Sequence, residues 1–128
     1  MSSEALLDLR DVSKSFRGLQ AVNGVSLTVQ AGEIVGLVGP NGSGKTTIIN
    51  LISGIVAVDS GEIRLEGGPI QSLPAFRRVQ LGINRSFQVP KPFRDMTVAE
   101  NLEVALMFGP ARRRCGVDPR CAWLYSAA

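Results

Sequence analysis

Glu33-Ile34-Val35-Gly36-Leu37-Val38-Gly39-Pro40-Asn41-Gly42-Ser43-Gly44-Lys45-Thr46-Thr47 is the most informative stretch of this 128-residue chain. It begins with a nearly continuous apolar run, which predicts a strand at 34–38 that is covered on both faces, as in a parallel sheet. The glycines and the proline that follow predict a loop at 39–44. A helix is expected from Lys45 to Ser53, because apolar residues then recur at helical spacing and Gly54 can serve as the C-terminal cap.

The loop also carries chemistry, because residues 39–46 match the pattern G-x-x-x-x-G-K-[ST]. Glycines allow successive backbone N–H groups to turn inward around a phosphate, and the free N–H groups at the start of the helix favour the same anion. Lys45 is expected to reach the β- and γ-phosphates of a nucleotide, and the hydroxyl of Thr46 is expected to bind Mg²⁺. The alternative interpretation is a flexible glycine loop before a helix, without a ligand.

Shorter patterns on both sides of the loop indicate a mixed α/β class. Alternating or apolar runs predict strands at 7–10, 25–29, 61–68 and 83–87. A short helix is expected at 73–80, with Pro74 in its first turn. Thr97 and Glu100 form a capping box before a further helix, whose apolar face consists of Val98, Leu102, Ala105 and Leu106.

Composition excludes several classes of protein. Apolar residues make up 45% of the chain and charged residues 20%, which argues against disorder and against a fibrous repeat. No stretch is long and apolar enough to span a membrane, and the acidic residues near the N-terminus do not fit a secretory signal. A cytoplasmic location is therefore expected.

The excess positive charge lies in the last twenty residues. The chain has 14 Lys and Arg against 11 Asp and Glu, a net charge of +3. Residues 109–128 hold four arginines and one aspartate, which accounts for this excess, so no nucleic-acid partner is indicated. The same tail holds Cys115 and Cys121, which are expected to be reduced thiols, and the chain has no His to complete a zinc site or to act as a general acid or base.

Several stretches together carry a resemblance to a known family. They are Val12-Ser13-Lys14-Ser15-Phe16, Val25-Ser26-Leu27, Gly32-Glu33-Ile34, the loop at 39–47, Asp59-Ser60-Gly61-Glu62-Ile63, Asn84-Arg85-Ser86-Phe87-Gln88 and Met96-Thr97-Val98-Ala99-Glu100-Asn101-Leu102. From about Leu7 to Met107 the chain resembles the N-terminal part of the ATP-binding subunit of an ATP-binding cassette (ABC) transporter. Arg85-Ser86-Phe87-Gln88 with Phe93-Arg94-Asp95-Met96-Thr97 is most similar to subunits of branched-chain amino acid importers.

The resemblance implies a P-loop NTPase fold. It implies a partial ABC nucleotide-binding domain at 5–108, with an antiparallel β-subdomain, part of a parallel core sheet and the start of a helical subdomain, followed by an atypical basic tail at 109–128. It also implies that ATP and Mg²⁺ bind, that Phe16 stacks on adenine, that Thr46 and Gln88 contact Mg²⁺, and that the phosphates are held by Gly39, Pro40, Asn41, Gly42, Ser43, Gly44, Lys45, Thr46 and Thr47.

The residues alone leave some of these roles open. A lone Phe near a strand end, such as Phe16, is more often a residue of core or turn packing, and Gln88 without the resemblance is an ordinary exposed amide after a strand. The segment 89–96, which the resemblance places against a transmembrane partner, is equally a plain loop that contains Pro90 and Pro92.

Several motifs of the family are absent from the sequence. There is no stretch like Leu-Ser-Gly-Gly-Gln, no apolar strand that ends in Asp-Glu after Gln88, and no His. The phosphate-binding side is thus present without the groups that activate water, so we expect weak Mg-ATP binding and negligible hydrolysis by this chain alone. A truncated or frame-shifted reading is expected to account for the last twenty residues, with a natural basic extension as the alternative.

The resemblance further implies a peripheral location at the inner face of the membrane, through transmembrane permease subunits and beside a second ATP-binding subunit. In the complete family, ATP hydrolysis drives transport, here of an amino acid. Three other functions stay open: a non-catalytic nucleotide-binding or regulatory fragment, a small P-loop kinase or GTPase, and a poorly folded remnant. The lack of an Asn-Lys-x-Asp guanine-reading motif argues against a GTPase.

Overall fold

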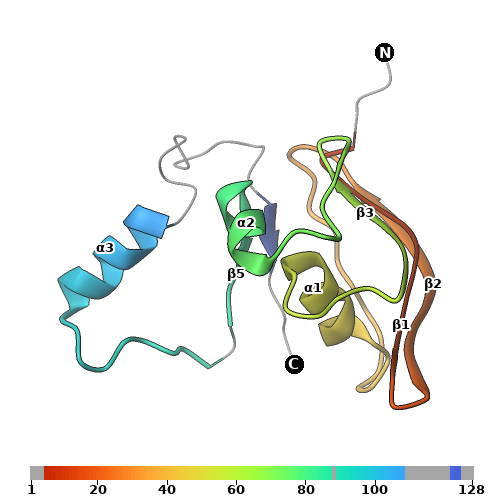
Figure 1. Cartoon of the computed structure of the whole chain (residues 1–128), viewed down its shortest axis with the longest axis horizontal. Helices are drawn as coiled ribbons and strands as arrows, with labels where there is room; N and C mark the ends of the chain where they lie inside the picture. Colours follow the sequence, from red (N-terminus) through yellow and green to blue (C-terminus); the bar gives the residue numbers. More distant parts are fainter. Residues whose placement is uncertain (1–4, 88, 109–121, 125–128) are drawn as a thin grey trace.

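The computed structural model of the chain describes residues 5–87, 89–108 and 122–124. In this part, a four-stranded antiparallel sheet with the strand order β2-β1-β3-β4 is accompanied by helices and by a parallel pair of short strands (Figure 1). The elements are β1 (Leu7–Phe16), β2 (Leu19–Val29), α1 (Lys45–Ser53), β3 (Ser60–Leu65), β4 (Gly68–Pro69), α2 (Ala75–Gln80), β5 (Ile83–Arg85), α3 (Val98–Phe108) and β6 (Ala122–Leu124).

The first two strands form a tight hairpin. Phe16 at the end of β1 pairs with Leu19 at the start of β2. The two residues between them, Arg17 and Gly18, both have positive φ angles of 49° and 85°, as a two-residue hairpin turn of the type I′ class requires. Phe16 therefore lies at the closed end of the hairpin.

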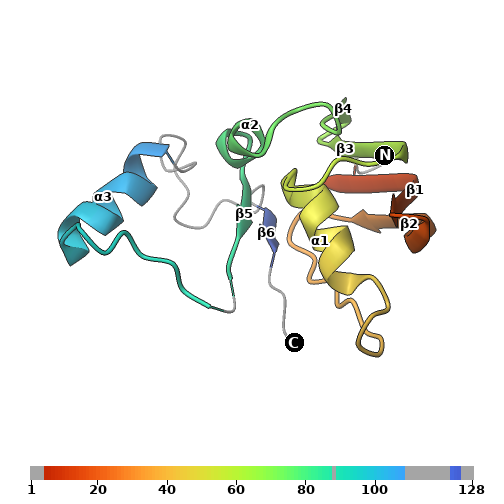
Figure 2. The same cartoon turned by 60° about the horizontal axis from the view of Figure 1, so that its bottom comes forward.

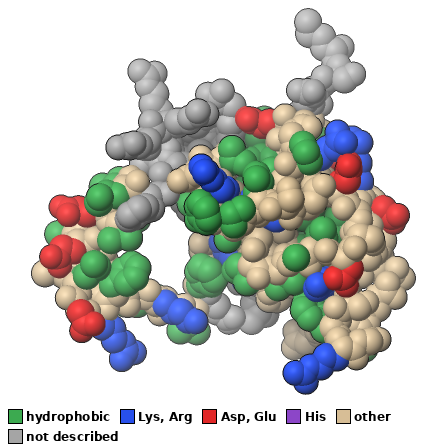
Figure 3. Space-filling model, viewed as in Figure 1, with side chains coloured by type: hydrophobic (Ala, Val, Ile, Leu, Met, Phe, Trp, Pro, Cys, Tyr) green, Lys and Arg blue, Asp and Glu red, His purple; other side chains and the backbone are tan. Residues whose placement is uncertain are grey.

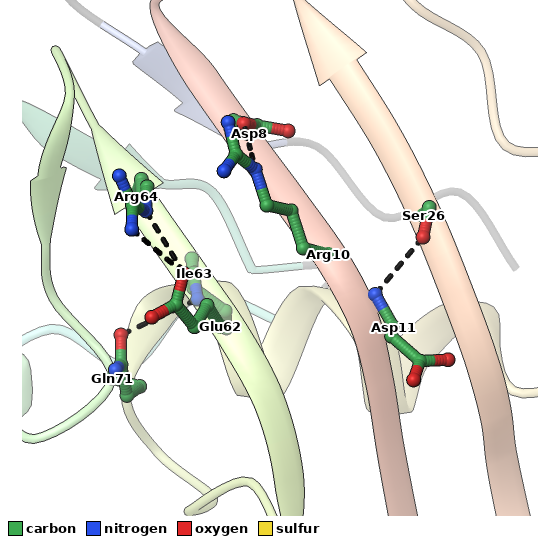
Figure 4. A network of polar contacts seen from close by, with 8 residues as sticks. All are labelled: Asp8, Arg10, Asp11, Ser26, Glu62, Ile63, Arg64 and Gln71. Carbon is green, nitrogen blue, oxygen red and sulfur yellow. Dashed lines mark hydrogen bonds and ion pairs between the residues drawn. The ribbon is translucent and has the colours of Figure 1, made fainter.

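A bulge in β1 keeps its apolar residues on one face. Leu9 and Val12 are both buried, although strict alternation would place them on opposite faces of the sheet. The ladder with β2 is irregular between these two residues, and Asp11 there has a positive φ of 50°, which returns Val12 to the core. The N–H of Asp11 donates instead to Oγ of Ser26 at 2.9 Å (Figure 4).

The core lies between the sheet and α1, which rests against one face of the sheet (Figure 2). Ile48, Leu51 and Ile52 of α1 pack in one cluster with apolar residues of β1, β2 and β3. Complete burial of one such side chain contributes about 1.5–3 kcal/mol, so this layer is the main source of stability for the described part. The expected helix at 45–53 is confirmed with the same bounds, and Gly54 caps it in the left-handed region at φ 78°.

A buried arginine fastens the C-terminal end of α1 to α2. The side chain of Arg78 is 2% exposed. Its Nη1 donates to the carbonyl oxygens of Leu51 at 2.6 Å and of Ile52 at 3.0 Å, while Nε and Nη2 donate to the carbonyls of Leu73 and Gln71 at 2.9 and 3.0 Å. Burial lowers the pKa of Arg78 from its ordinary value. The guanidinium thus satisfies carbonyl groups that a helix end leaves without partners.

The other expected elements form at or near their predicted places. The strands expected at 7–10 and 25–29 are parts of the longer β1 and β2, and the one expected at 61–68 forms as β3 with the short β4 beside it. The helix expected at 73–80 is α2, for which Pro74 is the N-cap. The strand expected at 83–87 is limited to β5.

The expected buried strand at 34–38 is wrong for this structure. The segment forms no strand, and Ile34 and Val38 are each 98% exposed. A buried parallel strand needs a neighbouring strand to pair its backbone and further elements to cover its two faces. No strand in the described ranges pairs with this segment, and its apolar side chains are exposed to solvent. Parallel pairing is found instead between β5 and β6.

Helix α3 begins with a capping box and leaves its apolar face exposed. The capping box is confirmed, since the Thr97 N–H donates to Glu100 at 2.7 Å and the Glu100 N–H donates to Oγ1 of Thr97 at 3.2 Å. The apolar face of α3 is exposed rather than packed, with Leu102 and Leu106 each 62% exposed (Figure 3). β6 lies in the tail, where the sequence shows no periodic pattern.

Candidate nucleotide-binding site

The glycine loop at 39–44 joins the exposed segment 34–38 to the N-terminus of α1, and Figure 2 shows it extending beyond that end of the helix. Gly44 is the N-cap, in the left-handed region at φ 91°. A Cβ atom on Gly44 would lie 2.5 Å from the carbonyl oxygen of Ala21 in β2, and a Cβ on Gly39 would lie 2.7 Å from Oγ of Ser43. Gly44 therefore requires glycine for both its backbone angle and its space, whereas a side chain at position 39 would displace the side chain of Ser43.

The first N–H groups of α1 are open to a ligand. Gly44 provides no side-chain cap, and the first turn carries no acidic residue. The N–H groups of Lys45, Thr46 and Thr47 have no hydrogen-bond partner within the described ranges. Such N–H groups lie at the positive end of the helix dipole, which is the usual environment for a phosphate. A phosphate group fits this cradle.

Lys45 folds back over its own loop. Its Nζ lies 2.5 Å from the carbonyl oxygen of Gly39, 2.8 Å from that of Pro40 and 3.5 Å from Oγ of Ser43. The ammonium group is held by neutral acceptors, and no salt bridge of Lys45 is present among the described residues. A phosphate oxygen is a stronger, charged acceptor that can replace these carbonyls.

The remaining motif residues lie at the surface. Asn41, Gly42 and Thr46 are exposed, and Thr47 is partly buried. The described residues contain no group of three or more Cys, Asp or Glu that could hold a metal ion by themselves. A hydroxyl such as that of Thr46 fits Mg²⁺ as one ligand beside phosphate oxygens, which is how this ion is usually bound.

Phe16 lies near the loop along β2. The loop approaches β2 at Ala21, through the close contact with Gly44 described above. Leu19, the partner of Phe16, is two residues from Ala21, which corresponds to roughly 7 Å along a strand. The ring of Phe16 is 44% exposed, and Nζ of Lys14 lies 5.4 Å from its centre. The structure therefore brings the exposed ring and the glycine loop to the same end of the hairpin.

Gln88 lies outside the described residues. The strand before it, β5, is connected to α1, because Arg85 donates through Nη1 to Oδ1 of Asn50. The guanidinium of Arg85 also lies 4.8 Å from the ring centre of Phe87.

The sequence did not reveal three contacts that hold this arrangement: the hydrogen bonds from Arg78 of α2 to the end of α1, the hydrogen bond from Arg85 to Asn50, and an ion pair between Lys14 and Asp59 at 2.6 Å. Each joins residues at least 26 positions apart in the chain. No local pattern signals such contacts.

A loop of the form G-x-x-x-x-G-K-[ST] at the start of a helix is the signature of P-loop nucleotide-binding domains. The sequence profile of the family described as ABC transporter matches residues 22–126, which include the whole loop. The chain therefore belongs to the ABC transporter family, in its group of ATP-binding cassettes. The matched range continues past residue 108, so the boundary between a domain at 5–108 and a tail at 109–128 stays a prediction.

Curated relatives agree with this assignment. The chain is 46% identical over 100 residues to the probable branched-chain amino acid transport ATP-binding protein LivG of Archaeoglobus fulgidus, covering 78% of this chain and 39% of that protein. It is 39% identical over 137 aligned positions to the high-affinity branched-chain amino acid transport ATP-binding protein LivG of Salmonella typhimurium, covering 95% and 54%. It is also 43% identical to the lipopolysaccharide export system ATP-binding protein LptB of Haemophilus influenzae, covering 89% and 49%.

Solved structures agree on the fold. A nucleotide-free ATP-binding cassette from an ABC transporter superposes with a TM-score of 0.71 at 38% identity, covering 79% of this chain and 40% of that one. The ADP conformation of an ATP-binding cassette superposes with a TM-score of 0.72 at 37% identity, covering 80% and 41%. The chain thus spans between 39% and 54% of the relatives described here. No helix within the described ranges is long and apolar enough to cross a bilayer.

Proposed function

We propose that this chain binds Mg-ATP at the glycine loop, as part of the ATP-binding subunit of an ABC transporter. The observation that carries the proposal is the uncapped N-terminus of α1, with three free N–H groups and the ammonium of Lys45 beside them. Residues 39–47 would hold the phosphates, and Phe16 would stack on the adenine. When bound, Mg²⁺ neutralises phosphate charge and is held in part by Thr46 and, as the resemblance implies, by Gln88.

The transported substrate is proposed from the relatives. Two of those described above are named as branched-chain amino acid transport proteins, which favours an amino acid importer. The similarity to a lipopolysaccharide export protein shows that the cassette alone does not fix the cargo. In the proposed assembly, transmembrane permease subunits and a second ATP-binding subunit complete the transporter at the inner face of the membrane, and hydrolysis drives transport.

The second candidate is a non-catalytic nucleotide-binding or regulatory fragment without ATPase activity. It is favoured by the sequence, which has no Asp-Glu-ended strand after Gln88, no signature-like stretch and no His. It is also favoured by the exposed apolar segment 34–38, because a P-loop usually follows a strand and no strand forms at this segment.

Titration calorimetry with Mg-ATP, followed by a steady-state ATPase assay, tests both candidates. The wild-type chain should bind Mg-ATP, and Lys45→Ala should weaken binding at least about tenfold, since it removes a charge-assisted contact. Lys91→Ala, which removes an exposed lysine outside the loop, is the matched control and should bind as the wild type does. Binding by K45A equal to wild type would contradict the proposed site. Lys45-dependent turnover would select the first candidate, and binding without turnover would select the second.

A further inference from the structure

The closed end of the β1–β2 hairpin is irregular, and this irregularity surrounds Phe16. The register between β1 and β2 shifts between Val12 and Lys14 and again between Lys14 and Ser15. β1 and β3 last pair at Ser13 and Ser60, so the final residues of β1 have no β3 partner. Regular backbone pairing alone therefore does not fix this end of β1 against β3.

Asp59, the residue before β3, replaces the missing pairing. Its N–H donates to the carbonyl oxygen of Ser13 at 3.1 Å. Its Oδ2 accepts the N–H of Ser15 at 2.7 Å, and its Oδ1 accepts Nζ of Lys14 at 2.6 Å. The hydrogen bond from Lys14, followed by that from Ser15, lowers the pKa of Asp59, so this carboxyl is ionised at neutral pH. Asp59 thus holds three consecutive residues of β1, Ser13 through its backbone N–H and Lys14 and Ser15 through its carboxylate.

Lys14 connects this carboxylate to the aromatic ring. Its side chain is 15% exposed, less than that of its partner at 45%. The ammonium group that Asp59 holds lies 5.4 Å from the centre of the Phe16 ring, within the range of a cation–π contact. The cation occupies one face of the ring, and a base that stacks on Phe16 requires the other.

We propose that Asp59 is a positioning residue of the adenine site, which acts through Lys14 to orient the Phe16 ring for stacking. The inference rests on the proposed function, because it takes Phe16 as the adenine platform. Asp59 fixes the ammonium, and the ammonium restricts the ring to one orientation before the nucleotide arrives. Preorganisation of this kind improves affinity because less side-chain freedom is lost on binding. Neither Asp59 nor Lys14 touches the base.

The test distinguishes the contribution of the adenosine to binding from that of the phosphates. Calorimetry with the full chain measures two ligands, Mg-ATP and Mg-tripolyphosphate, the second of which lacks the adenosine. Asp59→Asn keeps the shape of the side chain but removes its charge, and Lys14→Met keeps the length but removes the cation. Each is expected to weaken Mg-ATP about three- to tenfold and to leave Mg-tripolyphosphate within twofold. The double variant should be no weaker than either single one, because both changes interrupt the same connection.

Glu62→Gln is the matched control. Glu62 pairs with Arg64 at 2.9 Å within β3 (Figure 4), and no contact joins it to Lys14, Phe16 or Asp59 in the described part of the chain. This variant should bind both ligands as the wild type does. Unchanged Mg-ATP affinity in D59N and K14M would overturn the inference, and so would an equal loss of both ligands, which indicates a merely structural role. A wild-type chain that binds neither ligand would overturn the proposed function together with this inference. Binding of Mg-tripolyphosphate by each variant also shows that its phosphate site is folded.

Discussion

Replacement of Arg78 by Met should destabilise the chain strongly, because the side chain is buried and donates four hydrogen bonds to carbonyl groups. Ile52 loses the donor to its carbonyl, which costs about 1–3 kcal/mol for a buried acceptor. Leu51 keeps the N–H of Gly54 at 3.3 Å but loses a charge-assisted bond of about 1.5 kcal/mol. Met fills most of the volume and avoids burial of a charge, which offsets part of the loss. We expect a net cost of about 3 kcal/mol in the free energy of unfolding.

Urea unfolding followed by circular dichroism measures this cost. With a slope of about 1.5 kcal/mol/M, the midpoint should fall by roughly 2 M. Arg77→Met is the control, since Arg77 lies on the same helix and donates at the surface to Gln80; it should change stability by less than about 0.5 kcal/mol. Equal midpoints for R78M and R77M would refute the reasoning that Arg78 fastens the end of α1.

Three further predictions concern the loop, the capping box and the exposed segment. Gly44→Ala should reduce Mg-ATP affinity at least tenfold in calorimetry, because the new Cβ would lie 2.5 Å from a carbonyl oxygen of β2. Gly32→Ala is the control, since Gly32 also has a positive φ but has open space around it, and it should keep the wild-type affinity. Equal affinities of the two variants would contradict this reasoning. Thr97→Ala should lower the stability of α3 by about 1 kcal/mol, seen as faster amide exchange. Hydrogen bonds from Thr97 lower the pKa of Glu100, so the capping contribution should be present at neutral pH and lost as the pH falls through that lowered pKa. Protection factors of the α3 amides that stay constant as the pH falls would refute this. Ile34→Thr with Val38→Thr should reduce self-association in light scattering and leave the melting temperature unchanged, because both side chains are 98% exposed, and a marked drop in melting temperature would show that they are packed.

Local signals in the sequence predicted the elements whose causes are local. The bounds of α1 and its cap at Gly54 agree with the structure, because helical spacing and a left-handed terminal glycine are properties of neighbouring residues. The capping box at Thr97 was predictable for the same reason. The strand expected at 34–38 failed because a strand depends on neighbours elsewhere, which the pattern of one segment does not reveal.

The candidate site shows the same division. The loop and the position of Lys45 followed from a motif of eight consecutive residues. The proximity of Phe16 to the loop depends on the hairpin register, and the contact between Asp59 and Lys14 joins residues 45 positions apart. Only the folded arrangement brings these groups together, so they could not be predicted from composition or spacing.

Amide chemical shifts measured by NMR during a Mg-ATP titration test the central claim most directly. The claim is that the open N–H groups at the start of α1 bind the phosphates. The account predicts that the largest shifts occur at Lys45, Thr46 and Thr47, and that Mg-tripolyphosphate reproduces them. Nucleotide binding that leaves these amide signals in place and shifts others instead would contradict it.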